Sequence, residues 1–526
     1  MTSPPPEQPA IEAQRGGMPR HSRLTLVNIA FQYAQTCLLI VNGIVLTPLY
    51  LACIPERTFG AWLATGNIVA WLTLIDPGIN QVVQQRVAAA HAREDRAALG
   101  RLRTQSYILS AGLGLSLMTL GLAMTPFVRS FVNRLQCESP GEVMRAFHVA
   151  TVAGGCLIAC YGATVINIGM QCPAAAGMIY LASQVTNIAV VVGLLVSGAG
   201  VVSLPAGVLG QALVLGVGNA LYTSRQFAVQ AIPASFSWTG VRGLFADSTG
   251  TALSRLASVL SSNIDMVLTA CFLGPEQAVA LSMTQKGPGI ARTFVERPSH
   301  AAVPSLAAIH AGRNPAAVAA SGLRLFVAVI WVTIPAAAAT ILFNRPFVSL
   351  WVGADRFAGP QANLLIATAL VAGCAEVTLS NMAIAVGLFR ANGRIMLIRS
   401  LLSATLATLG AWAFGMAGLL AAPLIAGATT TLWLLPKSLA HAFAWGRPAV
   451  LAAGREVGSA VLAATLGAAA ALLCNTSSVA ELAAAMAVFG TVYACGMMIL
   501  SASCRHLVRD ITSHRLGQTR RPTSAS

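Results

Sequence analysis

Four charged side chains interrupt a single apolar stretch of this sequence. Between residues 277 and 300 the chain carries Lys286, Arg292, Glu296 and Arg297. Lys286 lies about ten residues from one end, close to the midplane if the stretch crosses a bilayer, where a Lys or Arg costs about 2.5 to 3.5 kcal/mol. Lys286 and Arg297 share one helical face, while Arg292 and Glu296 have the i, i+4 spacing of an ion pair. The charges either fix helix packing or form a cationic wall for an anionic head group.

Three acids lie in comparable surroundings. Glu376 is near the middle of the apolar stretch 361–388, where it can carry a proton or serve as a neutral, hydrogen-bonded structural acid. Asp265 ends a polar stripe with Ser254, Ser258 and Ser261. Asp76 stands in TLIDPGIN at 73–80, and an Asp followed by Pro is typical of a helix N-cap. For Asp76, both a capping role and a functional role stay open.

The first apolar stretch also contains a stripe of polar residues. Asn28, Gln32, Gln35 and Asn42 are spaced to lie on one helical face. Such stripes join helices through hydrogen bonds or line a path for a polar substrate.

The elements that must position these residues are membrane-spanning helices. Of the 526 residues, 56% are hydrophobic and 10% charged, and the mean hydropathy is +0.70, outside the range of ordinary soluble domains. Crossing a bilayer takes about 20 apolar residues, and lipid admits only helices or closed barrels. We predict fourteen spans near 24–50, 59–82, 104–127, 146–168, 175–197, 200–222, 247–273, 277–300, 320–343, 361–388, 395–416, 418–436, 455–474 and 478–500.

The net charge of +16 is explained by membrane topology. With both termini in the cytoplasm, most of the Lys and Arg fall in cytoplasmic segments, so nucleic acid is not an expected partner. Residues 1–23 are expected to be disordered and lack the features of a signal peptide. The eleven cysteines form no CxxC pair, which argues against a metal or a disulfide framework, and no cofactor is expected.

The chain contains two copies of one design. ACIPE at 52–56 matches ACFLGPE at 270–276, and VAAAHAR at 87–93 matches LAAIHAGR at 306–313, with offsets of 218 at Ala52 and 219 at His91. Six spans separate equivalent points, so the copies share one orientation. We predict a cytoplasmic N-terminus (1–23), a six-helix bundle (24–225), a linker (226–246), a second six-helix bundle (247–436), a linker (437–454), two further helices (455–500) and a basic tail (501–526).

The second apolar stretch and its surroundings resemble polysaccharide flippases of the multidrug/oligosaccharidyl-lipid/polysaccharide (MOP) exporter superfamily. The resemblance rests on Gly60, Trp62, Asp76 and Gly78 in this stretch and on SSNIDMVLTACFLGPEQ at 261–277, and it extends from about residue 24 to 440. The sequence departs from the family pattern at Pro77 and at the Lys-Gly-Pro-Gly of 286–289. The resemblance implies a V-shaped pair of six-helix bundles with a central cleft.

The resemblance also implies a function. Such proteins move undecaprenyl-pyrophosphate-linked oligosaccharides across the bacterial inner membrane for surface polysaccharides such as O-antigen, by ion-coupled alternating access. The implied substrate contacts are Lys286, Arg292, Arg297, Arg255, Gln32 and Gln35, and the implied coupling acids are Asp76, Asp265 and Glu376. The expected partners are the lipid bilayer, the lipid-linked oligosaccharide and a polysaccharide polymerase complex.

Alternatives within the superfamily are a lipid II flippase and a multidrug/cation antiporter, although a mostly acidic cleft would be expected for the antiporter. An integral-membrane glycosyltransferase or polymerase is disfavoured because the outer loops hold no acid or His cluster for catalysis. No GxxxxGK phosphate loop occurs, so ATP hydrolysis is not expected.

Overall fold

The computed structural model describes residues 20–311, 315–443, 445 and 447–505, and every regular element in these ranges is a helix. The first half comprises α1 (Arg20–Cys53), α2 (Glu56–Leu72), η1 (Thr73–Ile75), α3 (Ile79–Ala92), α4 (Arg96–Ala123), α5 (Thr125–Arg134), α6 (Pro140–Gly169), α7 (Pro173–Val196), η2 (Gly200–Val202) and α8 (Ser203–Val229). Of the segment 1–23 predicted to be disordered, residues 1–19 lie outside the described residues and residues 20–23 form the first turn of α1; residues 506–526 of the basic tail also lie outside.

The second half comprises α9 (Trp238–Phe272), α10 (Pro275–Ala311), α11 (Pro315–Val352), η3 (Ala354–Arg356), α12 (Pro360–Ala385), α13 (Phe389–Thr429) and α14 (Thr431–Phe443), and the chain continues with α15 (Arg447–Ala471) and α16 (Val479–Leu500). Ten helical segments of the described chain are long and apolar enough to cross a membrane. The all-helical membrane fold is thus confirmed, whereas the number of fourteen spans stays a prediction.

Glycine breaks one predicted span, 59–82, and separates two others, 395–416 and 418–436, as predicted. The stretch 59–82 breaks after Ile75, because Pro77 has no N–H to donate and Gly78 adopts φ 96°, which only glycine adopts readily. The polypeptide reverses inside α13 at Gly415, where φ is 61° and ψ is −140°. Backbone atoms of Gly410 and Gly418 then meet across the reversal, so α13 is two antiparallel segments.

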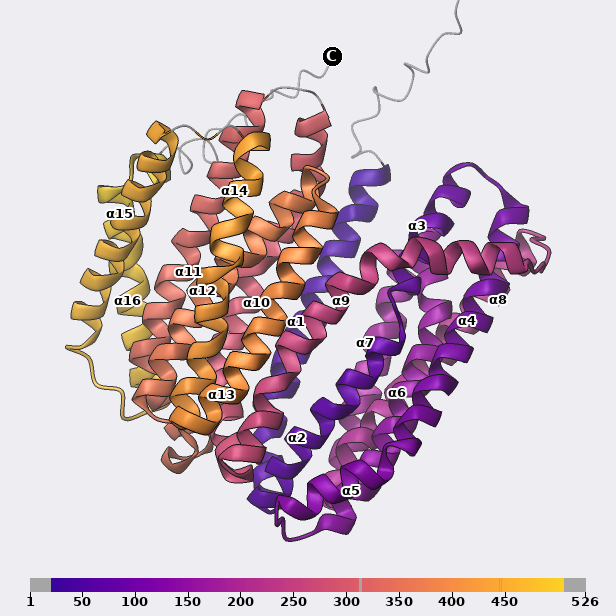
Figure 1. Cartoon of the computed structure of the whole chain (residues 1–526), viewed down its shortest axis with the longest axis horizontal. Coiled ribbons are helices and arrows are strands. Elements are labelled where there is room, and N and C mark those ends of the chain that lie inside the picture. The colour runs from indigo at the N-terminus through magenta and orange to yellow at the C-terminus, as the bar shows by residue number, and fades with distance from the viewer. Residues whose placement is uncertain (1–19, 312–314, 444, 446, 506–526) are drawn as a thin grey trace, which may run out of the picture.

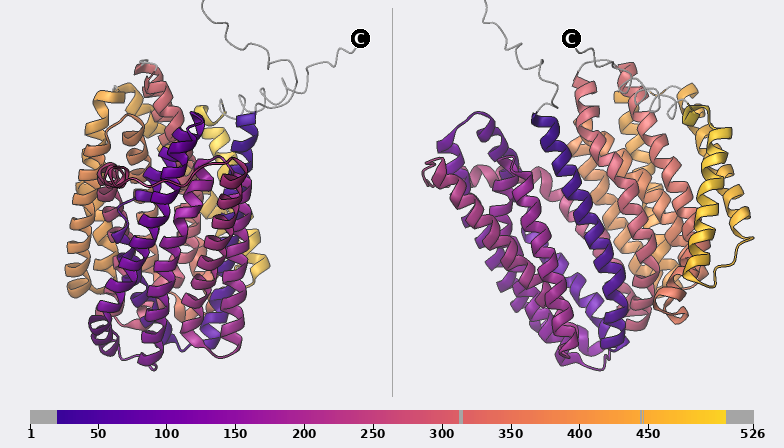
Figure 2. Two further views of the ribbon diagram at one scale, coloured as in Figure 1. Left: turned by 90° about the vertical axis from the view of Figure 1, so that its right-hand side faces the viewer. Right: turned by 180° about the vertical axis from the view of Figure 1, so that it is seen from behind.

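The two halves share a core at one end only. Figure 1 and Figure 2 show the helices of the two halves converging where α2 and α10 begin and diverging where α1 begins. We call these the closed end and the open end. One apolar cluster includes Leu46 and Phe59 of the first half together with Val279 and Val348 of the second. Away from the closed end the clusters are separate: one around Ile166 joins the first half to the start of α9, and one around Met382 lies in the second half.

Polar contacts add to the joint at the closed end. Arg57 forms an ion pair with Glu276, and Arg356 Nη2 lies 3.5 Å from Glu56 Oε2. The indole of Trp351 donates a hydrogen bond of 2.8 Å to the carbonyl of Ile44. The acids that end the matching motifs at 52–56 and 270–276 therefore each pair with an arginine of the other half where the halves join.

Helix α9 connects the halves across the open end (Figure 1). Near its start, Gln105 Nε2 donates to the carbonyl of Ser237 at 3.0 Å, and Arg86 Nη2 donates to that of Gly243 at 3.3 Å. Its last turns pack in the second half, where Leu268 joins a cluster with Leu281 and Leu419. Part of the predicted linker 226–246 is therefore helical.

The hairpin of α15 and α16 packs on the outside of the second half, against α11. Phe489 meets Phe343 edge to face at 5.8 Å, and Tyr493 donates from its hydroxyl to the carbonyl of Trp331 at 2.5 Å. The close approach of the two helices of the hairpin to each other depends on small residues such as Ala463 and Gly496.

Candidate functional site

Lys286 reaches across the boundary between the halves. A methyl group placed on Gly43 of α1 would lie 3.9 Å from Lys286 Nζ, so the ammonium of α10 faces a helix of the other half. Lys286 is half-buried and makes no ion pair or hydrogen bond with any residue that the structure describes. A cation in this position can accept an anionic ligand without first breaking a protein contact.

Arg292 lies two turns further along α10 and has an acid partner. Its Nε is 2.6 Å from Glu296 Oε1, as the i, i+4 spacing predicts. The guanidinium lies against α12, where a methyl group on Gly373 would be 3.5 Å from Arg292 Cζ. The geometry therefore supports the interpretation of Arg292 and Glu296 as a charge pair that helps to pack α10 on α12.

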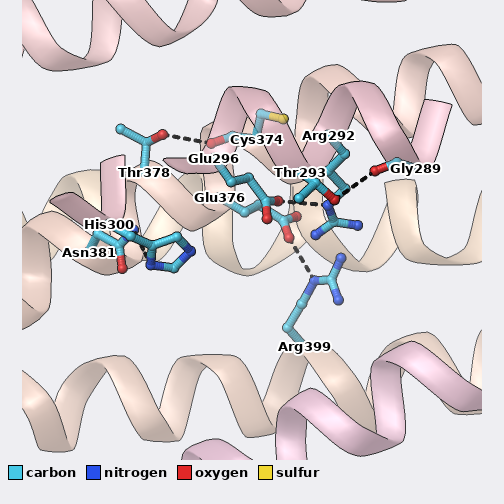
Figure 3. Close-up of polar contacts among 10 residues, drawn as sticks. All are labelled: Gly289, Arg292, Thr293, Glu296, His300, Cys374, Glu376, Thr378, Asn381 and Arg399. Atoms are coloured by element: carbon cyan, nitrogen blue, oxygen red, sulfur yellow. Dashed lines mark hydrogen bonds and ion pairs between the residues drawn. The ribbon is translucent and has the colours of Figure 1, made fainter. Parts of the chain in front are cut away.

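A second ion pair joins α12 to α13 within the second half. Arg399 Nε is 2.9 Å from Glu376 Oε2, and the side chains are only 16% and 6% exposed. Figure 3 shows this pair beside the pair of Arg292 and Glu296. The other oxygen, Glu376 Oε1, is buried without a hydrogen-bond partner among the described residues. It lies so close to α13 that a methyl group on Gly427 would be 1.9 Å away.

These four residues form a neutral cluster of two carboxylates and two guanidinium groups. The charge of Arg399 also acts on Asp265 of α9, and that of Glu376 acts on Arg292. Binding a proton or a metal cation at Glu376 would compete with Arg399, so the cluster has the chemistry of a switch between two pairings. We define Arg292, Glu296, Glu376 and Arg399 as the charge cluster.

A hydrogen-bonded group extends the charge cluster along α10 and α12. Asn381 Nδ2 is 2.9 Å from Ser299 Oγ and 3.2 Å from His300 Nδ1, and both contacts join the same two helices (Figure 3). Polar side chains thus continue along this interface toward the open end.

Sequence reasoning missed Arg399 and Gly427. Most of the Lys and Arg were assigned to membrane topology, although Arg399 falls four residues inside the predicted span 395–416. That location is the signal that could have identified it, since a cation within a span requires a partner.

Asp76 caps the helix that follows the break. Its Oδ1 accepts hydrogen bonds of 3.0 Å from the backbone N–H groups of Gly78 and Ile79, and its Oδ2 lies 3.4 Å from Asn80 Nδ2. Asp76 is 2% exposed and belongs to the first half, so it does not join the charge cluster. The N-cap position itself is Gly78, and Pro77 precedes it instead of opening the helix as the Asp-Pro motif predicts. Asp76 therefore binds the start of α3 from two residues further back, which still favours a structural role of the capping kind.

For the remaining predicted substrate contacts the structure gives less detail. Gln35 of α1 is half-buried, and Arg297 of α10 is partly buried and has an interaction partner. The side chains of Gln32 and Arg255 lie outside the part of the chain that the structure describes.

A family model described as "Polysaccharide biosynthesis protein" matches residues 26–310, more than half of the chain. The chain belongs to this family. The match covers the first half, α9 and α10, and so includes Lys286 but not Glu376 or Arg399. A comparison with curated proteins gave no match.

Solved structures share the fold at low sequence identity. A lipid II flippase, MurJ, in an inward closed conformation is 13% identical and superposes with a TM-score of 0.66 over 92% of this chain and 100% of its own. A multidrug resistance MATE family transporter of the MOP superfamily, in an inward-facing conformation, is 14% identical with a TM-score of 0.65 over 79% and 98%. A MATE structure in complex with MaD3S has a TM-score of 0.56 at 16% identity, over 81% and 96%.

These findings confirm the resemblance predicted from the sequence. The protein is a multi-spanning membrane protein of the polysaccharide biosynthesis family, and it has the fold of MATE transporters and MurJ.

Proposed function

We propose that the protein is a flippase that moves a polyprenyl-pyrophosphate-linked oligosaccharide across the bacterial inner membrane for surface polysaccharide synthesis. The observation that carries the proposal is Lys286, a cation that faces α1 from α10 without an acid partner among the described residues. A pyrophosphate head group is negatively charged, so it can supply the anionic partner that the ammonium of Lys286 lacks among these residues.

The distribution of basic residues supports an orientation with the open end toward the cytoplasm. The start of α1, the turn from α3 to α4 and the start of α15 all lie toward the open end (Figure 1), and the sequence of these segments includes Arg93, Arg96 and Arg447. In this orientation the head group enters from the cytoplasm and meets Lys286, while the polyprenyl tail stays in lipid. Opening the closed end would then release the head group on the other side.

The charge cluster is proposed as the coupling site. A proton or cation that binds Glu376 removes the negative charge held by Arg399, and Arg399 can then turn to Asp265, which its charge already reaches. Because Glu376 and Arg399 lie on α12 and α13, this change alters how these helices pack. Such a change in packing within the second half is what alternating access requires.

The experiment uses the two lysines of the chain. Lys286→Gln and the control Lys437→Gln are expressed in cells that lack the endogenous flippase, and surface polysaccharide and protein abundance are measured together. Lys437 is exposed on α14 with its ammonium 5.5 Å from the ring of Trp433, so its substitution leaves the boundary between the halves intact. We expect cells with Lys286→Gln to display little surface polysaccharide and cells with Lys286→Arg to display part of the wild-type amount. Cells with Lys437→Gln should display the wild-type amount.

The same strains distinguish the alternatives. Wild-type polysaccharide with an abundant Lys286→Gln protein would refute the assignment of Lys286. Rescue of cells depleted of their lipid II flippase would favour a lipid II substrate, and a gain of drug resistance without polysaccharide would favour an antiporter.

A further inference from the structure

A cavity separates part of the hairpin of α15 and α16 from the second half. Its volume is about 590 Å³, within the range of small-ligand sites. The walls come from α11, with Val327 and Trp331, from α15, with Ala453 and Glu456, and from Ser503 after α16. The lining residues belong to the early part of α11, the early part of α15 and the chain after α16. Figure 1 shows α15 and α16 beside the second half, with the start of α15 toward the open end.

The cavity is lined mainly by apolar side chains but holds one charge of each sign. Arg324 and Glu456 both line it, yet no ion pair joins the two residues. Arg324 is exposed and forms no ion pair with any other described residue. Two opposite charges therefore line one largely apolar cavity without pairing to each other.

The carboxylate of Glu456 is fixed in place and still has room for a donor. Its Oε2 accepts a hydrogen bond of 2.5 Å from Ser501 Oγ, and its Oε1 accepts one of 2.6 Å from Ser503 Oγ. A carboxylate offers about four lone-pair sites, so each oxygen can accept once more. An ammonium group is a suitable donor because it also neutralises the charge.

The charges select the ligand. A simple anion would be attracted by Arg324 and repelled by Glu456, and a simple cation would meet the reverse. A molecule with a phosphate and a primary ammonium a few atoms apart satisfies both residues, and the apolar walls require that it also carry a hydrocarbon chain. The surrounding bilayer supplies molecules of this class.

We infer that the cavity binds a phospholipid with a phosphoethanolamine head group. The phosphate pairs with Arg324, the ammonium donates to Glu456, and an acyl chain lies along Val327, Trp331 and Ala453. The lipid lies apart from Lys286 and the charge cluster, so the inference does not depend on the transported substrate.

Such a lipid would bridge α11 and the hairpin. The direct contacts between them include Tyr493 with Trp331 and Phe489 with Phe343, and the cavity leaves the adjoining surfaces unfilled. A ligand that binds only the docked hairpin stabilises the folded chain by mass action.

The test compares three lipids on the purified full-length protein in detergent. Dioleoyl phosphatidylethanolamine, its choline analogue and dioleoyl phosphatidylglycerol are titrated, with binding followed by native mass spectrometry and stability by thermal unfolding. The choline analogue has no N–H to donate and the glycerol analogue has no cation. We expect each to bind about tenfold more weakly than the ethanolamine lipid, the effect of one charged hydrogen bond.

Variants assign the two charges. Glu456→Gln should remove the preference for phosphatidylethanolamine over phosphatidylglycerol. Arg324→Gln should weaken the binding of all three lipids by about tenfold. Arg455→Gln is the matched control, because Arg455 is exposed on α15 next to Glu456 but does not line the cavity. It should bind all three lipids as the wild type does.

Equal binding of the three head groups to the wild-type protein would overturn the inference, and this comparison needs no variant to fold. Displacement of the ethanolamine lipid by a low concentration of polyprenyl phosphate would also overturn it, because the cavity would then belong to the transported lipid.

Discussion

Glu376 and Arg399 are buried together, and neither charge has adequate solvent to replace its partner. Removing one member of a buried pair leaves an uncompensated charge and costs about 3 to 5 kcal/mol, whereas replacing both is far less harmful. We therefore expect Glu376→Gln and Arg399→Gln each to lower the free energy of unfolding strongly. The double variant should recover much of the loss. Unfolding in mixed micelles with rising dodecyl sulfate measures all three.

The pair of Arg292 and Glu296 provides the comparison. The Arg292 and Glu296 side chains are 49% and 19% exposed, so this pair is less enclosed than that of Glu376 and Arg399 and should contribute less to stability. Arg292→Gln should therefore lower stability less than Glu376→Gln does. If Glu376→Gln were no more harmful, the buried pair would not have the energetic role assigned to it.

Gly427 sets the position of Glu376. A methyl group at residue 427 would lie 1.9 Å from Glu376 Oε1. In the variant Gly427→Ala the carboxylate of Glu376 must therefore move away from α13 and from Arg399. We expect lower thermal stability and reduced polysaccharide export. Gly490→Ala on α16 is the control, because nothing lies within 4 Å of the added methyl group. Equal behaviour of the two variants would contradict the close approach of Glu376 to α13.

At the scale of single elements, the break between α2 and α3 offers a test of Asp76. Asn caps helices about as well as Asp, whereas Ala costs about 0.5 to 2 kcal/mol. If Asp76 only caps α3, Asp76→Asn should export polysaccharide at the wild-type level and Asp76→Ala should be less stable. Thermal unfolding and export are measured on the same preparations. Loss of export in a stable Asp76→Asn protein would instead establish the carboxylate as a functional acid.

Helices were predictable from the sequence because hydropathy and turn chemistry act over short distances. The apolar stretches and the contact of Asp76 with the start of α3 both follow from neighbouring residues. The pairing of Glu376 with Arg399 does not, because it depends on how α12 and α13 rotate against each other. Lys286 was identified by its depth in an apolar stretch, but its approach to Gly43 depends on the packing of two halves that are far apart in sequence.

At the scale of the whole molecule, the asymmetry between the two ends follows from where the apolar clusters lie. The cluster at the closed end includes residues of both halves, while the clusters nearer the open end are separate. Opening the closed end must therefore expose apolar side chains, which makes that step the costly one. The ion pairs at the edge of the closed end make only a small further contribution to the free energy of opening it.

The rim pair of Arg57 and Glu276 is the adjustable part of the closed end. The two side chains are 54% and 43% exposed, so their attraction contributes less than about 1 kcal/mol, equivalent to about fivefold in the balance of closed and open states. We expect Arg57→Glu to favour opening by repulsion, and the exchange Arg57→Glu with Glu276→Arg to restore closure. Spin labels at the exposed Cys53 and Cys271, with the other cysteines replaced, report the distance between the halves.

Acid should imitate the loss of this pair. Hydrogen bonding from the backbone and from Arg57 lowers the pKa of Glu276, against an opposing effect of burial. Because the pKa of Glu276 is lowered, its carboxylate is fully ionised and attracts Arg57 at neutral pH. The attraction is lost only as the pH falls below the ordinary pKa of a glutamate side chain, about 4.3. The wild-type distance distribution should therefore broaden only in strong acid, and Glu276→Gln should remove this dependence. A pH response retained in Glu276→Gln would show that another group controls the closed end.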